Sequence, residues 1–191
     1  MSAPAEVLTP SSPRPLTGSW QIDPVHSGVE FAVTHLMISK VRGRFSDITG
    51  TVVSDGTPEG SRVEVQIGAA SIDTHEAARD THLRSADFFD VEKYPQLTFV
   101  STGIRSKSPD EFHVTGDLRM HGVTKAIEFD VTSEGTGGDP WGGTRAGFSS
   151  TFTLDRRDFG LTWNQAIEAG GVLVSNAIKV NLDIQLTQKA S

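Results

Sequence analysis

The most constraining feature of this chain is the alternation of apolar and polar side chains, which repeats with a period of two along most of its length. In VEFAVTH, residues 29–35, Val29, Phe31 and Val33 share a predicted strand face that ends on His35. Such alternation is typical of a β-strand with one dry face. The same pattern recurs in residues 111–120, 125–131, 144–154 and 174–186. The alternation therefore predicts an all-β chain.

Short turn signals separate these segments. Gly, Pro and Asp occur in SDGTPEGS, KSPD and MHGVT, and the sequence lacks the repeated helical crossovers that parallel strands need. Each predicted strand has one apolar face with no second layer to cover it, so the apolar faces must meet one another. Closing the sheet brings them together and removes the sheet edges. We predict a closed antiparallel β-barrel of about eight strands.

Two interruptions of the strand pattern are predicted. The alternation slips by one residue at Ser46-Asp47, which indicates a β-bulge. Residues 74–95, THEAARDTHLRSADFFDVEKYP, indicate one inserted helix, with Thr74 as its N-cap and Pro95 marking its end. A short helix inserted into a β chain is expected to cover an open mouth of the barrel.

The first residues differ in composition from the rest. Residues 1–16 are rich in Pro, Ser and Ala, and they have neither the basic start nor the apolar run of a secretory signal. We predict a disordered leader over residues 1–16 and a barrel domain over residues 17–191, in a cytoplasmic protein. No later segment approaches the roughly 18 continuous apolar residues of a membrane span, so no integral membrane segment is expected.

Charge and cysteine content exclude several classes of function. The formal net charge is −7 at pH 7, so the chain lacks the electrostatic footprint of a nucleic-acid binder or of a protein attracted to anionic lipid surfaces. The chain has no cysteine, which excludes disulfides, thiolate catalysis and cysteine-ligated metals. No nucleic-acid partner is expected.

Four motifs resemble the YceI-like family. They are WQIDPVHSGVEFAVTHLMISKVRGRF, DTHLRSADFFDVEKYPQLTF, VTGDLRMHGVTK and RRDFGL, and the resemblance extends from about Gly18 to about Leu186. It implies an extended lipocalin-like barrel that binds a long apolar chain, namely a polyisoprenoid, a prenylated quinone or a fatty acid derivative. It also implies a homodimer with no cofactor besides the bound chain. Many members are periplasmic and carry a signal peptide, which is not expected in this sequence.

The expected ligand-binding residues follow from the strand faces and from the predicted ends of the barrel. The interior candidates are Phe31, Val33, Phe99, Phe112, Leu118, Phe129, Phe148, Phe152, Ile178 and Leu182. The candidates at an end are His35, Leu36, Met37, Phe88, Phe89 and Trp163. Together with Ile38, the pair Leu36 and Met37 is interpreted either as an apolar lip through which a chain enters or as a plain core cap.

The alternation does not decide whether the interior of the barrel is filled or holds a ligand. An eight-stranded barrel can be filled by its own side chains or can hold one ligand. The main hypothesis is non-enzymatic binding, transport or storage of a long apolar chain. One alternative is a small lipid-acting enzyme with His35 or His82 as a base at the barrel mouth. The other is a filled barrel that serves as a stress-response interaction module.

Neither a metal site nor a catalytic residue is predicted. The six histidines show no HxH or HExxH spacing, and no G-x-S-x-G motif is present. In RRDFGL, Arg157 is interpreted either as a contact for a pyrophosphate or other polar head, or as part of an Arg157–Asp158 corner that fixes the loop beside Phe159 and Trp163. The structural interpretation is favoured, since an arginine fork binds loop carbonyls and carboxylates equally well.

Overall fold

The computed structural model describes residues 15–140, 142–166 and 172–188. The predicted leader, residues 1–16, lies outside these ranges apart from its last two residues. The strands are β1 (Thr17–Ile22), β2 (Gly28–His35), β3 (Ser39–Phe45), β4 (Ile48–Asp55), β5 (Arg62–Gly68), β6 (Ile72–Asp73), β7 (Gln96–Ser106), β8 (Glu111–Met120), β9 (Val123–Gly138), β10 (Thr144–Asp155) and β11 (Ala177–Gln188). The helices are η1 (Ala69–Ser71), α1 (Ala77–Arg84) and η2 (Arg156–Phe159), and no described helix has the length and apolarity to cross a membrane.

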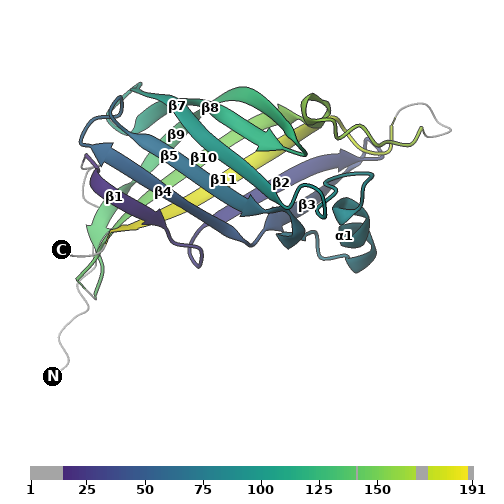
Figure 1. Cartoon of the computed structure of the whole chain (residues 1–191), viewed down its shortest axis with the longest axis horizontal. Coiled ribbons are helices and arrows are strands. Elements are labelled where there is room, and N and C mark those ends of the chain that lie inside the picture. Colours follow the sequence, from purple (N-terminus) through teal and green to yellow (C-terminus); the bar gives the residue numbers. More distant parts are fainter. Residues whose placement is uncertain (1–14, 141, 167–171, 189–191) are drawn as a thin grey trace.

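The strands form one antiparallel sheet that closes on itself (Figure 1). The ring order is β1-β4-β5-β7-β8-β9-β10-β11, and β1 pairs with β11 to close it. β2 continues β1 along the same edge of β11, and β3 pairs with β2 before the chain passes into β4. The described strands thus make a closed barrel of eight strands, which confirms the predicted all-β antiparallel architecture.

The alternation slips at Ser46-Asp47 as predicted, but the predicted β-bulge is wrong, because the slip is a break between two strands and not an extra residue within one. β3 ends at Phe45 and β4 begins at Ile48, three residues further along the chain, and both of these side chains are buried. A regular strand would place them on opposite faces, so the two intervening residues shift the register of the inner face. The backbone N–H of Gly68 donates to the carbonyl oxygen of Asp47 at 2.9 Å, which keeps the neighbouring strand attached at this bend.

Helix α1 lies at one end of the barrel, beside β3 (Figure 1), and is shorter than predicted. Its N-cap is Glu76, whose carboxylate accepts hydrogen bonds from the backbone N–H groups of Ala78 and Arg79. The prediction that Thr74 caps the helix is wrong. Thr74 is buried, and its hydroxyl donates to the buried carboxylate of Asp80 at 2.6 Å, so it anchors the segment before α1 to the helix.

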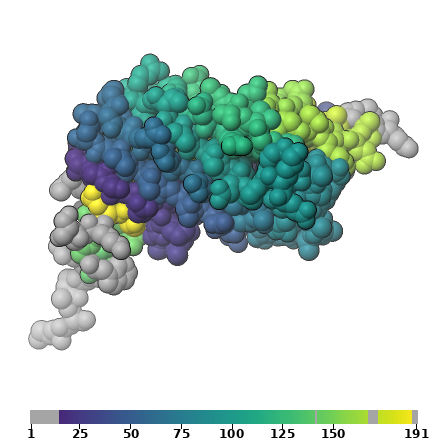
Figure 2. All heavy atoms as spheres, viewed as in Figure 1, coloured from purple at the N-terminus to yellow at the C-terminus, as the bar shows by residue number. Residues whose placement is uncertain are grey.

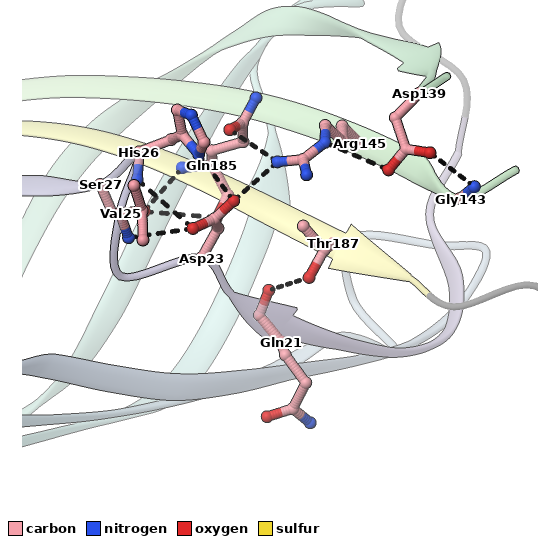
Figure 3. Close-up of polar contacts among 10 residues, drawn as sticks. All are labelled: Gln21, Asp23, Val25, His26, Ser27, Asp139, Gly143, Arg145, Gln185 and Thr187. Atoms are coloured by element: carbon pink, nitrogen blue, oxygen red, sulfur yellow. Dashed lines mark hydrogen bonds and ion pairs between the residues drawn. The ribbon is translucent and has the colours of Figure 1, made fainter. Parts of the chain in front are cut away.

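A partly buried ion-pair network holds the junction between β1 and β2 against β10 and β11 (Figure 3). Arg145 Nη1 donates to Asp23 Oδ2 at 2.6 Å and to Gln185 Oε1 at 3.0 Å, and its Nε donates to Asp139 Oδ2 at 3.3 Å. The His26 ring nitrogen Nδ1 lies 2.8 Å from Asp23 Oδ2. Burial alone would raise the pKa of Asp23, but hydrogen bonds from His26 and Arg145 outweigh it and lower that pKa to about 2.

The substitution Asp23→Asn is expected to remove an acid-sensitive part of the stability. The pKa of this carboxyl is about 2 in the folded chain against 3.8 ordinarily, so its contribution is present above pH 3.8 and is lost as the pH falls through 2. The wild type should therefore have a higher free energy of unfolding than Asp23→Asn above pH 3.8, by at most about 2 kcal/mol. Urea titrations should show this difference shrinking as the pH falls from 3.8 towards 2. Asp117→Asn, at an exposed carboxylate without an ion pair in the described ranges, is the control. A difference in unfolding free energy between the wild type and Asp23→Asn that stays constant over this pH range would contradict this account.

Candidate ligand-binding cavity

The barrel encloses a cavity of about 870 Å³. Its lining is mainly apolar and extends from Thr57 and Pro58, in the turn between β4 and β5, to α1 and Trp163 at the other end of the barrel. On the face shown in Figure 2, side chains close the wall between the strands. The interior is therefore hollow, and the alternative of a filled barrel is wrong.

Most of the predicted ligand-binding residues line this cavity. On the strands they are Phe31, Val33, His35, Phe99, Phe112, Leu118, Phe129, Phe148, Phe152, Ile178 and Leu182. At the end near α1 they are Phe88, Phe89 and Trp163. The alternation of the strands therefore identified the inner face correctly, whereas contact of these residues with a ligand stays a prediction.

Leu36 and Met37 do not line the cavity. They occupy the turn between β2 and β3 with exposed fractions of 37% and 66%, which rules out the core-cap interpretation. Their φ angles of 50° and 62° place two consecutive non-glycine residues in the left-handed region. This backbone reverses the chain at the end of the hairpin, and the alternation that would return the side chains to the inner face ends at His35.

The inner phenylalanines lie along the wall of the barrel. Phe129 stacks on Phe152 with ring centroids 4.5 Å apart, and the Phe99 ring lies 5.5 Å from that of Phe129. A Cβ atom at Gly116 would approach Phe99 Cζ to 2.4 Å, so only glycine lets this ring lie against β8. Because these rings pack on the wall and on one another, they leave the middle of the barrel open.

The end near α1 combines aromatic rings with polar side chains. The His82 ring meets Trp163 edge to face at a centroid distance of 4.7 Å and Phe88 at 5.1 Å, which links α1 to the segment after η2. Arg79 also lines the cavity, and its guanidinium donates to the hydroxyl and carbonyl oxygens of Thr74 at 2.7 and 3.0 Å. Arg79 forms no ion pair with any residue in the described ranges.

The opposite end of the cavity carries neutral hydroxyl groups. Ser54, Thr57 and Ser61 line it around the turn between β4 and β5, and Ser61 Oγ lies 2.7 Å from Ser54 Oγ. Ser106 and Ser133 lie on the same lining, from β7 and β9. The two ends therefore differ chemically, with hydroxyls at one end and, at the other, aromatic rings, the Arg79 guanidinium and the Glu76 carboxylate that caps α1. The strand alternation gave no signal for this difference.

The two histidines considered as a base differ in their surroundings. His82 takes part in a local contact, since its Nε2 lies 2.9 Å from Asp87 Oδ2. His35 lines the cavity at the end of β2. Among residues 15–140, 142–166 and 172–188, no three His, Asp or Glu side chains gather closely enough to hold a metal ion.

The adjacent arginines of η2, Arg156 and Arg157, have different roles, and Arg157 does not have the predicted one. Arg157 pairs with Asp155, not with Asp158, and Nε lies 3.0 Å from Asp155 Oδ1. Hydrogen bonds from Arg157 lower the pKa of Asp155 to about 2. The predicted Arg157–Asp158 corner is therefore wrong, because the carboxylate preceding η2 is the one within reach of Arg157. Arg156 fixes the loop instead.

Arg156 is only 4% exposed and binds two segments of the chain, residues 161–163 and Ser175. Its Nη1 donates to the carbonyl oxygens of Leu161 and Trp163 at 2.6 and 2.8 Å, and its Nε donates to that of Ser175 at 3.0 Å. Burial lowers the pKa of Arg156 from its ordinary value. Arg156 is therefore a structural clamp that holds Trp163 at the mouth of the cavity. The sequence alone does not show which of the two consecutive arginines points inward.

A closed antiparallel barrel with a hollow apolar interior defines a lipocalin-like class of β-barrel protein. The chain belongs to the YceI-like family, whose domain model matches residues 20–186. The predicted resemblance is confirmed. The chain is 47% identical over 137 residues to a UPF0312 protein of Pseudomonas putida strain GB-1, and 44% identical over 137 residues to one of Azotobacter vinelandii strain DJ. Each match covers 71% of this chain and 71% of the relative.

Solved structures share the fold. The YCEI protein of Campylobacter jejuni is 31% identical, with a TM-score of 0.71 over 82% of this chain and 90% of that one. Burkholderia cenocepacia BcnA has a TM-score of 0.75 at 21% identity, over 86% of this chain and 98% of that one. A polyisoprenoid binding domain from Saccharophagus degradans has a TM-score of 0.67 at 14% identity, over 89% and 98%. At these last two identities the likeness concerns the fold alone.

Proposed function

We propose that this protein binds one long apolar chain inside the barrel, without covalent chemistry. The observation that carries the proposal is the apolar cavity of about 870 Å³ that extends from the turn between β4 and β5 to α1. This volume lies near the upper end of the about 300–1,000 Å³ range of small-molecule sites. A barrel interior of this kind favours an extended hydrocarbon over a compact polar substrate.

The energetics of burial support a chain of several prenyl units. Each buried methylene-sized group contributes about 0.8 kcal/mol, so three or four prenyl units give useful affinity even after the entropic cost of binding. The proposed ligand class is a polyisoprenoid, a prenylated quinone or a fatty acid derivative. The description of the Saccharophagus degradans domain as polyisoprenoid binding fits this class.

The unequal ends of the cavity suggest how such a molecule is oriented. Arg79 and the rings of His82 and Trp163 lie at the α1 end, together with Glu76, whose carboxylate is occupied by the backbone N–H groups of Ala78 and Arg79. Ser54 and Ser61 provide only neutral hydroxyls at the other end. A polar or anionic head group is better accommodated beside a guanidinium that forms no ion pair within the described ranges. We therefore place the head group at the α1 end and the tail along the phenylalanines.

The biological role that we infer is storage, transport or shielding of this molecule in a cytoplasmic protein that forms a homodimer. Analytical ultracentrifugation of the purified protein distinguishes a monomer from a dimer directly.

Ligand uptake can be measured with purified protein and three probes: an all-trans polyprenol, a prenylated quinone and a fluorescent fatty acid. The wild-type protein is expected to take up about one equivalent of at least one probe with roughly micromolar affinity or tighter. Native mass spectrometry gives the stoichiometry, and fluorescence titration gives the affinity. Wild-type protein that ignores all three probes and releases no lipid on solvent extraction would overturn the proposal.

Two histidine variants separate binding from catalysis in the same assay. His35→Ala and His82→Ala are expected to keep uptake within a factor of about three, because dispersed apolar contacts provide most of the affinity. If the protein were a lipid-acting enzyme with one of these histidines as its base, the wild type would convert the probe and the corresponding variant would not. Uptake of the probe would be retained in both cases. Chromatography of the recovered probe shows whether wild-type protein alters it.

A further inference from the structure

The turn between β2 and β3 presents a run of exposed apolar side chains. Ile38 is 86% exposed and Met37 66% exposed, and Leu36 precedes them. The backbone N–H of Leu36 donates to the carbonyl oxygen of Leu173 at 2.9 Å, which places the exposed Val172 beside this turn. We call these four residues, Leu36, Met37, Ile38 and Val172, the apolar tip. Contiguous exposed apolar side chains of this kind mark a surface that contacts a partner or a membrane.

Three exposed cations lie on the outer wall next to the apolar tip. Lys179 of β11 is opposite Ala32 of β2, and Ala32 is opposite Arg42 of β3, so Lys179 and Arg42 project from one face in one row across the sheet. Lys40 lies one step nearer the tip on that face, opposite Thr34. We call Lys40, Arg42 and Lys179 the basic row.

The charge of the basic row is not neutralised locally. Within the described residues, none of its three members forms an ion pair within 4.0 Å. Arg44, farther from the tip on β3, lies opposite Glu30 and 3.5 Å from Asp73. Free positive charge is therefore concentrated next to the apolar tip in a chain whose formal net charge is −7.

We propose that the apolar tip and the basic row dock the α1 end of the barrel on an anionic lipid bilayer. The tip enters the boundary between head groups and acyl chains, and the basic row contacts the lipid phosphates, as in other peripheral proteins that combine apolar and basic side chains. The tip borders the cavity end, since His35 lines the cavity and the next residue is Leu36. Docking therefore places this end of the cavity at the membrane surface.

A bilayer fits these residues better than a second copy of the chain. Two-fold pairing of this surface would bring two basic rows together, and like charges across an interface are unfavourable. Lysine is also depleted in protein interfaces, whereas it is attracted to anionic lipid head groups. The docking proposal rests on the proposed function only in one respect, namely that the molecule exchanged with the membrane is the long apolar chain. Docking itself can be measured on protein that carries no bound chain.

The test is flotation of the full chain with vesicles of phosphatidylcholine alone or mixed with phosphatidylglycerol. Wild-type protein should float with the anionic vesicles, and binding should weaken as salt is raised from about 0.02 to 0.5 M. Lys40→Gln with Arg42→Gln should lower the partition coefficient roughly tenfold or more, and Met37→Asp with Ile38→Asp should lower it at least as much. All these positions are exposed, so the variants should fold.

Matched control variants make the outcome specific. Arg105→Gln with Arg119→Gln changes the net charge equally on exposed residues of β7 and β8. Val25→Asp with Val53→Asp adds two carboxylates at exposed valines away from the tip. Both controls should bind as the wild type does. The proposal fails if wild-type protein ignores anionic vesicles, if the controls lose binding equally, or if the tip variants change only the oligomeric state. Uptake of a probe added from ethanol should persist in the tip variants, which separates failure of docking from failure of ligand binding.

Discussion

Tryptophan at both Leu118 and Leu182 is expected to abolish uptake of a long apolar chain, with a loss of affinity of about a hundredfold or more. Both leucines line the cavity, from β8 and β11 respectively, and neither is fully buried. The larger rings occupy space that a hydrocarbon would otherwise fill. Because the cavity measures about 870 Å³, it can take both rings without forcing the strands apart.

The measurement is titration with the fluorescent fatty acid, accompanied by thermal unfolding. The stability of the double variant should stay within about 1–2 kcal/mol of the wild type, since the added volume enters an existing void. Val25→Trp with Val53→Trp places the same rings on exposed positions and should leave uptake unchanged. Undiminished uptake by the folded Leu118/Leu182 variant would show that the chain does not bind inside the barrel.

Arg156→Met is expected to destabilise the protein by about 3–5 kcal/mol, with a fall in melting temperature on the order of 10 °C. The guanidinium of Arg156 satisfies carbonyl oxygens of Leu161, Trp163 and Ser175, and a thioether leaves these acceptors buried without donors. Loss of the clamp also frees Trp163 from the end of the cavity. Uptake should therefore weaken even at temperatures where the variant remains folded.

The neighbouring arginine is a matched control for this prediction. Arg157 is exposed and pairs with Asp155, so Arg157→Met should cost no more than about 1 kcal/mol. Arg156→Lys retains the charge but cannot reach as many carbonyls, and its stability should fall between the wild type and Arg156→Met. Equal melting temperatures for Arg156→Met and Arg157→Met would refute the clamp.

The strand alternation carried most of the information about the interior. Phe31, Phe99, Phe129 and Ile178 were assigned inward from period two alone, and each lines the cavity. A strand has only two faces, so one apolar face in a closed sheet can point only inward. The same argument stops where a strand stops, and for that reason the alternation assigns no face to Leu36, which does not line the cavity.

Polar contacts were less predictable than strand faces. Thr74 has the sequence context of an N-cap, yet it is buried against Asp80 and Glu76 takes the capping role. Arg156 and Arg157 are indistinguishable as neighbours in sequence, and only the path of residues 172–176 decides which one is buried. These contacts join segments far apart in the chain or depend on which side chain turns inward, and local patterns do not record either.

Net charge was informative for the whole molecule but not for one surface. The value of −7 argued against attraction to anionic lipid, whereas Lys40, Arg42 and Lys179 come from two distant strands and meet on one patch of the outer wall. Averaging over the sequence hides such a patch because the strand register, not chain proximity, brings its members together.

The sequence by itself determined a closed antiparallel barrel, the inward face of its strands and the bend at Ser46-Asp47, because these follow from side-chain periodicity and short turns. Only the tertiary structure decided that the barrel is hollow, that its two ends differ in polarity and that Arg156 clamps one of them. The physical reason is that periodicity assigns a side chain to a face. Whether opposite walls touch depends on how the rings pack over Gly116 and its counterparts around the barrel.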